Sequence, residues 1–296
     1  MIEQALYEHL QAKDYLLLPY LATYSDRMAI FSQEASADND SFWGEGPQYG
    51  RIVFAVDLQG DPERTMGGSL SVDILCKKGL ESPGDPEDIE PIVRSLIHGY
   101  FFSAGTFTVS AQWADSRYFT EPQNEVIGCT MTFDLLAFPI ITGTLLDVIS
   151  RLNAWCVPRF PNIHVINAAP LPAPAWKPVK GESAVYWRVL KEDPAGWIQD
   201  SWSTIWRTAT VKGHIFSETP AEAYSAGQTI ITRLYSDKRI FKDGESPIMV
   251  NRRNSYDNSA DPLRTGQVTI EGTYGIIVYT PPEETIQTIN KPGPLG

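Results

Sequence analysis

The sequence has 296 residues, of which 43% are hydrophobic and 20% are charged. A chain of this length holds one large domain or two ordinary ones, and this composition predicts a packed core rather than a disordered chain. The longest apolar run, residues 135–141, is too short to span a membrane, and the acidic N-terminal region lacks the features of a signal peptide. We therefore expect a soluble protein made in the cytoplasm, without a membrane partner.

Charge is distributed unevenly along the chain, whose net charge is -12. Residues 1–139 contain 8 basic and 21 acidic residues, giving -13, whereas residues 140–296 contain 16 and 15, giving +1. An acidic half repels phosphate, so tight or sequence-specific binding of nucleic acid is disfavoured. A solvated acidic surface that keeps the protein in solution is the simpler explanation of the same charge.

The cysteines and histidines offer no metal or disulfide pattern. Cys76, Cys129 and Cys156 are odd in number and lack CxxC spacing, so we interpret them as small buried hydrophobic residues. The four histidines lie far apart and match no ligand motif. The sequence therefore predicts no metal and no cofactor.

Hydrophobic periodicity predicts six main elements in the first half. They are a helix at residues 2–13, strands at 51–59 and 69–77, a helix at 88–102, and strands at 106–114 and 125–138. Acidic residues before the second helix suit the positive end of its dipole. We expect a loop at residues 33–50, where acidic residues, Gly and Pro are concentrated, and another at residues 115–124, which joins the last two strands.

The second half repeats this order. The predicted elements are a helix at 143–155, strands at 184–192 and 209–217, a helix at 220–235, and strands at 246–254 and 266–280. Thr219 is the expected cap of the second of these helices, with Pro220 at its first position. Matched elements lie about 130 to 145 residues apart, which is natural for a duplicated domain.

The sequence thus predicts an α+β fold made of two tandem copies of an αββαββ domain, each a mainly antiparallel four-stranded sheet with two helices. Residues 1–139 form the first copy, residues 140–280 the second, and residues 281–296 an extended C-terminal tail. Because the chain between the copies is short, we expect them to sit at a fixed relative angle.

No catalytic motif is present, and we expect no enzyme activity and no catalytic residues. The nearest candidates are two acidic clusters, Asp57 with Asp61 and Glu63, and Glu87 with Asp88 and Glu90. Paired carboxylates serve in hydrolysis. Turn formation explains the first cluster better, and a helix start explains the second.

The order of elements in the first half resembles the tail terminator, or tail completion, proteins of tailed bacteriophages. The similarity lies in residues 7–10, 49–58, 69–76, 89–100 and 125–138, taken in order. The second half is similar only through the repeat. Members of this family are usually single domains, so a tandem chain leaves open whether three or six chains form a ring. The charge contrast between the halves favours six, in two layers.

The resemblance implies a structural virion protein in the head-proximal part of the tail, assembled in the host cytoplasm. It would form a homo-oligomeric ring that ends polymerisation of the tail tube protein and joins the tail to the head–tail connector or neck protein. Genomic DNA would pass through the lumen without specific binding. Another neck or tail structural protein is the alternative, and a soluble ligand-binding or hydrolytic module is the alternative from a different class.

Five aromatic residues in predicted loops or at strand edges are candidate interface residues, because Trp and Tyr often anchor partner surfaces. They are Trp43, Tyr49, Trp197, Trp202 and Trp206. Core packing is the alternative explanation for them, since eight tryptophans cannot all lie on a surface.

Overall fold

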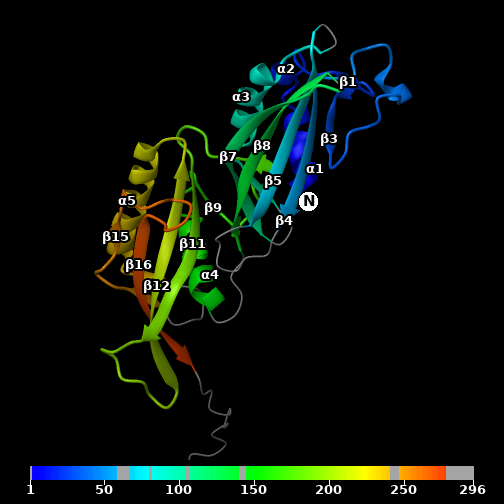
Figure 1. The fold of residues 1–296 in the computed structure, drawn as a ribbon. Coiled ribbons are helices and arrows are strands. Elements are labelled where there is room, and N and C mark those ends of the chain that lie inside the picture. The colour runs from blue at the N-terminus through cyan, green and yellow to red at the C-terminus, as the bar shows by residue number, and fades with distance from the viewer. Residues whose placement is uncertain are drawn as a thin grey trace, which may run out of the picture.

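The computed structural model describes residues 2–58, 67–79, 82–103, 107–123, 125–139, 145–240 and 247–277. These residues form two large β-sheets, each covered on one face by helices (Figure 1). None of the helices in these ranges is long and apolar enough to cross a membrane. The predicted extended tail at residues 281–296 lies outside the described residues.

The first sheet has seven strands in the order β10-β6-β7-β8-β5-β4-β3. Their bounds are β3 (Ile30–Ser32), β4 (Arg51–Leu58), β5 (Gly68–Lys77), β6 (Phe101–Ser103), β7 (Thr108–Glu121), β8 (Val126–Phe138) and β10 (Ala175–Trp176). β3 runs parallel to β4, and the other pairs are antiparallel. A separate small sheet pairs β1 (Thr23–Tyr24) with β2 (Arg27–Met28).

Helices α1 (Ile2–Gln11), α2 (Asp14–Leu17) and α3 (Pro86–Ile97) accompany the first sheet, and a single 3-10 turn, η1, covers Ser41–Trp43. Leu6 and Leu10 of α1 share one core with Val93 of α3 and Val72 of β5. In β5, buried residues alternate with half-buried ones along the whole strand. One face of this sheet therefore meets the helices, and we call the opposite face its outer face.

The second sheet contains β9 (Ile163–Val165), β11 (Ser183–Pro194), β12 (Thr204–Ser217), β13 (Arg239–Ile240), β14 (Ile248–Val250), β15 (Ser255–Tyr256) and β16 (Val268–Ile277). Its strand order is β13-β14-β16-β12-β11-β9, with β15 also paired to β16. β9 lies parallel to β11. Helices α4 (Leu145–Cys156) and α5 (Pro220–Asp237) share a core with its strands.

The cap of α5 is as the sequence predicts. Thr219 Oγ1 accepts the Glu222 N–H, and the Glu222 carboxylate accepts the Thr219 N–H, both at 3.3 Å. This reciprocal capping box satisfies two donors that the first turn of a helix leaves without partners. Pro220 follows at the first helical position.

The predicted fold class is wrong, because the chain forms two mixed seven-stranded sheets rather than two four-stranded αββαββ sheets. The additional strands are short and are held by pairing with distant segments. β3, β6 and β9 have three residues each, and β10 and β13 have two, too few for local periodicity to indicate them. The connectivity is nevertheless the same in both sheets, with a parallel edge strand, a hairpin, a helix and a returning hairpin.

Two local assignments also differ from the sequence predictions. The second helix of the first half ends at Ile97, and Gly99 adopts a φ of +79°, so Phe101 and Phe102 continue as strand β6 rather than as helix. Residues 115–121, predicted as a loop, belong to β7 and pair with β8 beyond a bulge between Trp113 and Asp115. The hairpin is therefore longer than expected.

The two sheets meet through an aromatic junction formed by Phe101, Phe138, Ile166, Ala184 and Tyr186, with Phe216 packed against them. Ring centroids are 5.1 Å apart for Phe101 and Phe216, 5.2 Å for Phe138 and Tyr186, and 5.5 Å for Phe138 and Phe216. Edge-to-face contacts of this kind add to the stabilisation from burial itself.

Backbone contacts reinforce the junction. Tyr186 donates its hydroxyl to the Pro139 carbonyl at 2.9 Å, and Asn167 Nδ2 donates to the Phe138 carbonyl at 2.8 Å. β10 lies beyond residue 139 yet joins the first sheet by pairing with β6, Trp176 opposite Phe101. A segment preceding β11 is thus built into the sheet of the first half.

Val93→Asp tests the helix–sheet core of the first half. Val93 is fully buried on α3, so a carboxylate there would be desolvated without a partner and should cost about 3 kcal/mol or more. Thermal melting followed by circular dichroism should show a large fall in Tm. Ser95→Asp, exposed on the same helix, is the control, and equal melting of both variants would contradict the packing described.

Candidate functional site: the outer faces of the two sheets

The outer face of the first sheet carries three aligned rows of mostly polar residues, set by strand register. One row is Asp57, Ser69, Asp134 and Gln112; the next is Ala55, Ser71, Thr132 and Asp115; the third is Val53, Asp73, Thr130 and Arg117. Four carboxylates and one guanidinium therefore share these rows. These three rows are acidic, and in the two rows beyond them the same face carries Arg51 and, beside Glu121, Lys77, so carboxylates still outnumber cations on it.

Local hydrogen bonds hold parts of this face in place. Thr130 Oγ1 donates to Asp73 Oδ1 at 2.6 Å across β5 and β8. Arg117 Nε donates to Asp115 Oδ2 at 2.7 Å. Hydrogen bonds from Arg117 and from the Ser116 backbone N–H hold the pKa of Asp115 below its ordinary value.

The outer face of the second sheet has a different charge. Register places Arg188 opposite Lys212, Lys191 opposite Thr210 and Asp193 opposite Thr208, while Glu271 lies opposite Thr210 on the other side of β12. Lys212 Nζ donates to Thr269 Oγ1 at 2.8 Å. Three cations and two carboxylates share this face, so the charge contrast between the halves also exists between the two outer faces.

The candidate interface residues separate into two groups. Trp43 and Tyr49 are buried, with exposed fractions of 3% and 8%, which agrees with core packing, the alternative explanation for these residues. Trp43 Nε1 donates to the Ala37 carbonyl at 2.9 Å, and its ring packs against Tyr24. These two residues brace the long loop at residues 33–50 instead of offering a surface.

The other three candidates lie together in the β11–β12 hairpin. Trp197 and Trp202 are 63% and 74% exposed, and both belong to the connection between the strands. Trp206 is half-buried in β12, where its backbone N–H donates to Asp200 Oδ1 at 2.7 Å. This hairpin therefore presents aromatic surface at Trp197 and Trp202, and its role in an interface stays a prediction.

A carboxylate–guanidinium pair secures the loop beneath Tyr49. Arg51 Nη1 donates to Asp38 Oδ1 at 2.8 Å, the Tyr49 hydroxyl donates to Asp38 Oδ2 at 3.0 Å, and the Arg51 guanidinium lies 4.5 Å from the Tyr49 ring centroid. Partial burial alone would raise the pKa of Asp38, but the hydrogen bonds from Arg51 and Tyr49 outweigh it and lower that pKa.

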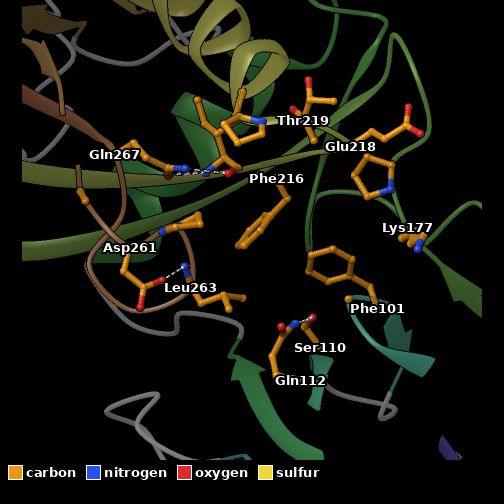
Figure 2. A pocket seen from close by; sticks show the side chains of 18 of the residues that line it. Phe101, Ser110, Gln112, Lys177, Phe216, Glu218, Thr219, Asp261, Leu263 and Gln267 are labelled. Carbon is orange, nitrogen blue, oxygen red and sulfur yellow. Dashed lines mark hydrogen bonds between the residues drawn. The ribbon is translucent and has the colours of Figure 1, made fainter. Parts of the chain in front are cut away.

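A cavity of about 730 Å³ lies between the halves, beside the aromatic junction (Figure 2). Phe101, Ser110 and Gln112 line one side, and Phe216 and Thr219 line the other.

Side chains of this cavity also stabilise the fold. Both ends of the buried Gln267 amide hydrogen-bond the Ile215 backbone at 2.9 Å, and Asp261 Oδ1 accepts the Leu263 N–H at 2.7 Å. Burial, together with the charges of Lys177 and Arg94, lowers the pKa of His98. The Nδ1 atom of His98 accepts a hydrogen bond from the backbone N–H of Trp113. We interpret the cavity as a groove created where the two halves meet.

Within the described ranges, no group of three or more His, Cys, Asp or Glu side chains is placed to hold a metal ion. Cys76, Cys129 and Cys156 are buried, as predicted, and burial raises the pKa of the Cys156 thiol to about 12. The comparisons with protein-family models, curated proteins and solved structures found no match to this chain.

Sequence reasoning missed the rows of carboxylates on the first outer face. The sequence pattern that could have indicated these rows is the alternation of Ser69, Ser71 and Asp73 with buried residues in β5. Alternation assigns these side chains to one face, but only the pairing with β4, β7 and β8 brings Asp57, Asp115 and Asp134 into line with them.

Asp38→Asn tests the loop brace. A lowered pKa in the folded state gives stability that is present above the ordinary value of 3.8 and is lost as pH falls through the folded value. The variant should therefore lose about 1 kcal/mol at neutral pH, since Asp38 is half-exposed, and should match the unmodified protein below about pH 2. Urea unfolding at several pH values measures this.

The control for this prediction is Asp26→Asn, an exposed position with a φ of +64° that asparagine tolerates. It should leave the pH profile unchanged. A loss of stability in Asp38→Asn that is the same at pH 2 and pH 7 would contradict the role given to the carboxylate charge.

Proposed function

We propose that this protein is a structural subunit that forms a ring at the head-proximal end of a bacteriophage tail tube. It ends tube polymerisation, joins the tail to the connector or neck, and lets genomic DNA pass through its lumen. The resemblance of residues 1–139 to tail terminator proteins supports this proposal. So do the exposed tryptophans of the β11–β12 hairpin, which suit contact with another protein surface.

The observation that carries the proposal is the acidic, polar outer face of the first sheet. Asp57, Asp73, Asp115 and Asp134 are aligned on it, and Arg117 is the cation in their rows. A channel through which duplex DNA slides must not bind phosphate, because each phosphate neutralised by a basic side chain adds affinity through counterion release. Carboxylates on a lumen wall keep the DNA free to move.

The repeated connectivity of the two sheets bears on the number of chains. A tandem chain can supply two equivalent positions of one ring, so three chains make a pseudo-sixfold ring. Alternatively, six chains stack as two layers of different charge. The contrast between the two outer faces is easier to place on two layers than around a single lumen, which favours six chains.

Electron microscopy of the purified protein and of particles carrying it tests the proposal. We expect annular particles with a central hole wide enough for duplex DNA, and a ring at the head end of the tail. The mass of the ring should be near ~100 kDa for three chains or ~200 kDa for six, from the 33.0 kDa chain. A stable monomer at assembly concentrations, together with virions that lack the protein, would contradict it.

The double variant Asp73→Lys with Asp134→Lys tests the role of the acidic face. Two cations there should give the assembled protein affinity for duplex DNA that is measurable at about 50 mM salt and much weaker at about 200 mM. Fluorescence anisotropy with a labelled duplex measures this. Glu8→Lys with Glu34→Lys, exposed on other parts of the first half, is the matched control. Equal DNA binding by both variants would mean that added positive charge anywhere on the first half causes the binding, and would contradict the role given to the acidic face.

A further inference from the structure

The hairpin strand β7 has an open backbone edge. All of its fourteen residues except Ala114, at the bulge, pair with β8, but β6 covers only Thr108–Ser110 on the other side. Within the described residues no strand pairs with this edge over residues 115–121, and Tyr118 and Phe119 are 51% and 38% exposed. An uncovered strand edge with exposed aromatic residues is a template for pairing with another strand.

Strand β11 of the second sheet has an open edge of the same length. β9 covers only Ser183–Val185, so residues 188–194 have no neighbouring strand on that side among the described residues. Leu190 is 53% exposed at this edge, where a bulge shifts the register between Val189 and Lys191. Each chain thus offers two open edges of seven residues, one on each sheet.

Each edge carries one cation and one carboxylate at matching spacing, and within its own chain Arg117 pairs with Asp115 at 2.7 Å and Asp193 with Lys191 at 2.9 Å. On β7, Glu121 and Arg117 share the outer face, four residues apart. On β11, Arg188 and Asp193 share the outer face and are also four ladder steps apart, because the bulge at Leu190 adds one residue. An antiparallel pairing that places Glu121 opposite Arg188 therefore places Arg117 opposite Asp193, with Phe119 opposite Lys191 at the centre.

We propose that β7 of one chain pairs antiparallel with β11 of a second copy of this chain, in this register. This contact rests on the proposed function, because it is the one through which the ring closes. It joins the outer face of the first sheet to the outer face of the neighbour's second sheet. Cross-strand pairs of opposite charge and main-chain hydrogen bonds fix the register.

The contact is heterologous, since each chain contributes a different edge to each of its two neighbours. Such contacts form a closed ring when the rotation between chains closes and an open filament when it does not. A single type of contact therefore suffices for the ring, and no self-complementary patch is required.

Disulfide trapping tests this register. The paired Cα atoms of an antiparallel ladder lie about 4.5 to 5.5 Å apart, within the range that a disulfide spans. Phe119→Cys and Lys191→Cys are prepared as separate proteins, each of the full chain. The native thiols of Cys76, Cys129 and Cys156 are buried and give little background.

Oxidation of an equal mixture should give a crosslinked dimer of about twice the 33.0 kDa chain mass, whereas each protein alone gives at least about tenfold less. A chain carrying both cysteines should give a ladder that ends at the number of chains in the ring. The control replaces Phe119→Cys by Leu18→Cys, which is 51% exposed on the first half.

Three outcomes would overturn the proposed pairing: no crosslink at any concentration, an equal crosslink with the Leu18→Cys control, or crosslinking of each protein with itself. Charge reversal gives an independent measurement in solution. Arg117→Asp or Asp193→Arg alone should weaken association about tenfold, and the two together should restore it. Weakening that is additive in the double variant would contradict the pairing.

Failure of this contact and failure of the proposed function give different results. Rings on phage tails without the Phe119–Lys191 crosslink would leave the function intact and remove the contact. A crosslinked ladder from a protein that is absent from virions would keep the contact and remove the function.

Discussion

The aromatic junction between the two sheets is the contact on which the relative placement of every other surface depends. Phe101 and Phe138 come from the first sheet, and Tyr186 and Phe216 from the second. Full burial of one such ring contributes about 3 kcal/mol relative to exposure, and the edge-to-face contacts add to this. The junction uses one end of each outer face, so the remaining polar parts of both faces stay uncovered by helices.

This arrangement explains how two sheets with the same order of elements can have outer faces of different charge. Each sheet buries an apolar face under its own helices, which leaves the outer face free to vary without loss of the core. On the first outer face carboxylates outnumber cations, whereas the second carries three cations, Arg188, Lys191 and Lys212, and two carboxylates.

The sequence predicts elements whose signals are local. The capping box of α5, the apolar face of α3 and the alternation in β5 were all accessible from residue patterns. The two-residue strand β10 was not, because it exists only by pairing with β6 across the junction.

The candidate site was only partly predictable for the same reason. Trp197 and Trp202 lie in a polar connection and are exposed, as expected, but Trp43 and Tyr49 lie in an equally polar loop and are buried. What buries them is packing against Tyr24 and ion pairing between Asp38 and Arg51, contacts between segments that a local pattern does not connect. Alignment of the carboxylates likewise depends on register between distant strands.

A distance measurement between the halves tests most directly whether the junction fixes the two sheets. Spin labels at Glu87→Cys on α3 and Ser236→Cys on α5, both exposed, report this distance by double electron–electron resonance. A rigid junction predicts a single narrow distance distribution, which Phe138→Ala should broaden by removing the ring at its centre. A broad distribution in the protein with Phe138 intact would contradict the account.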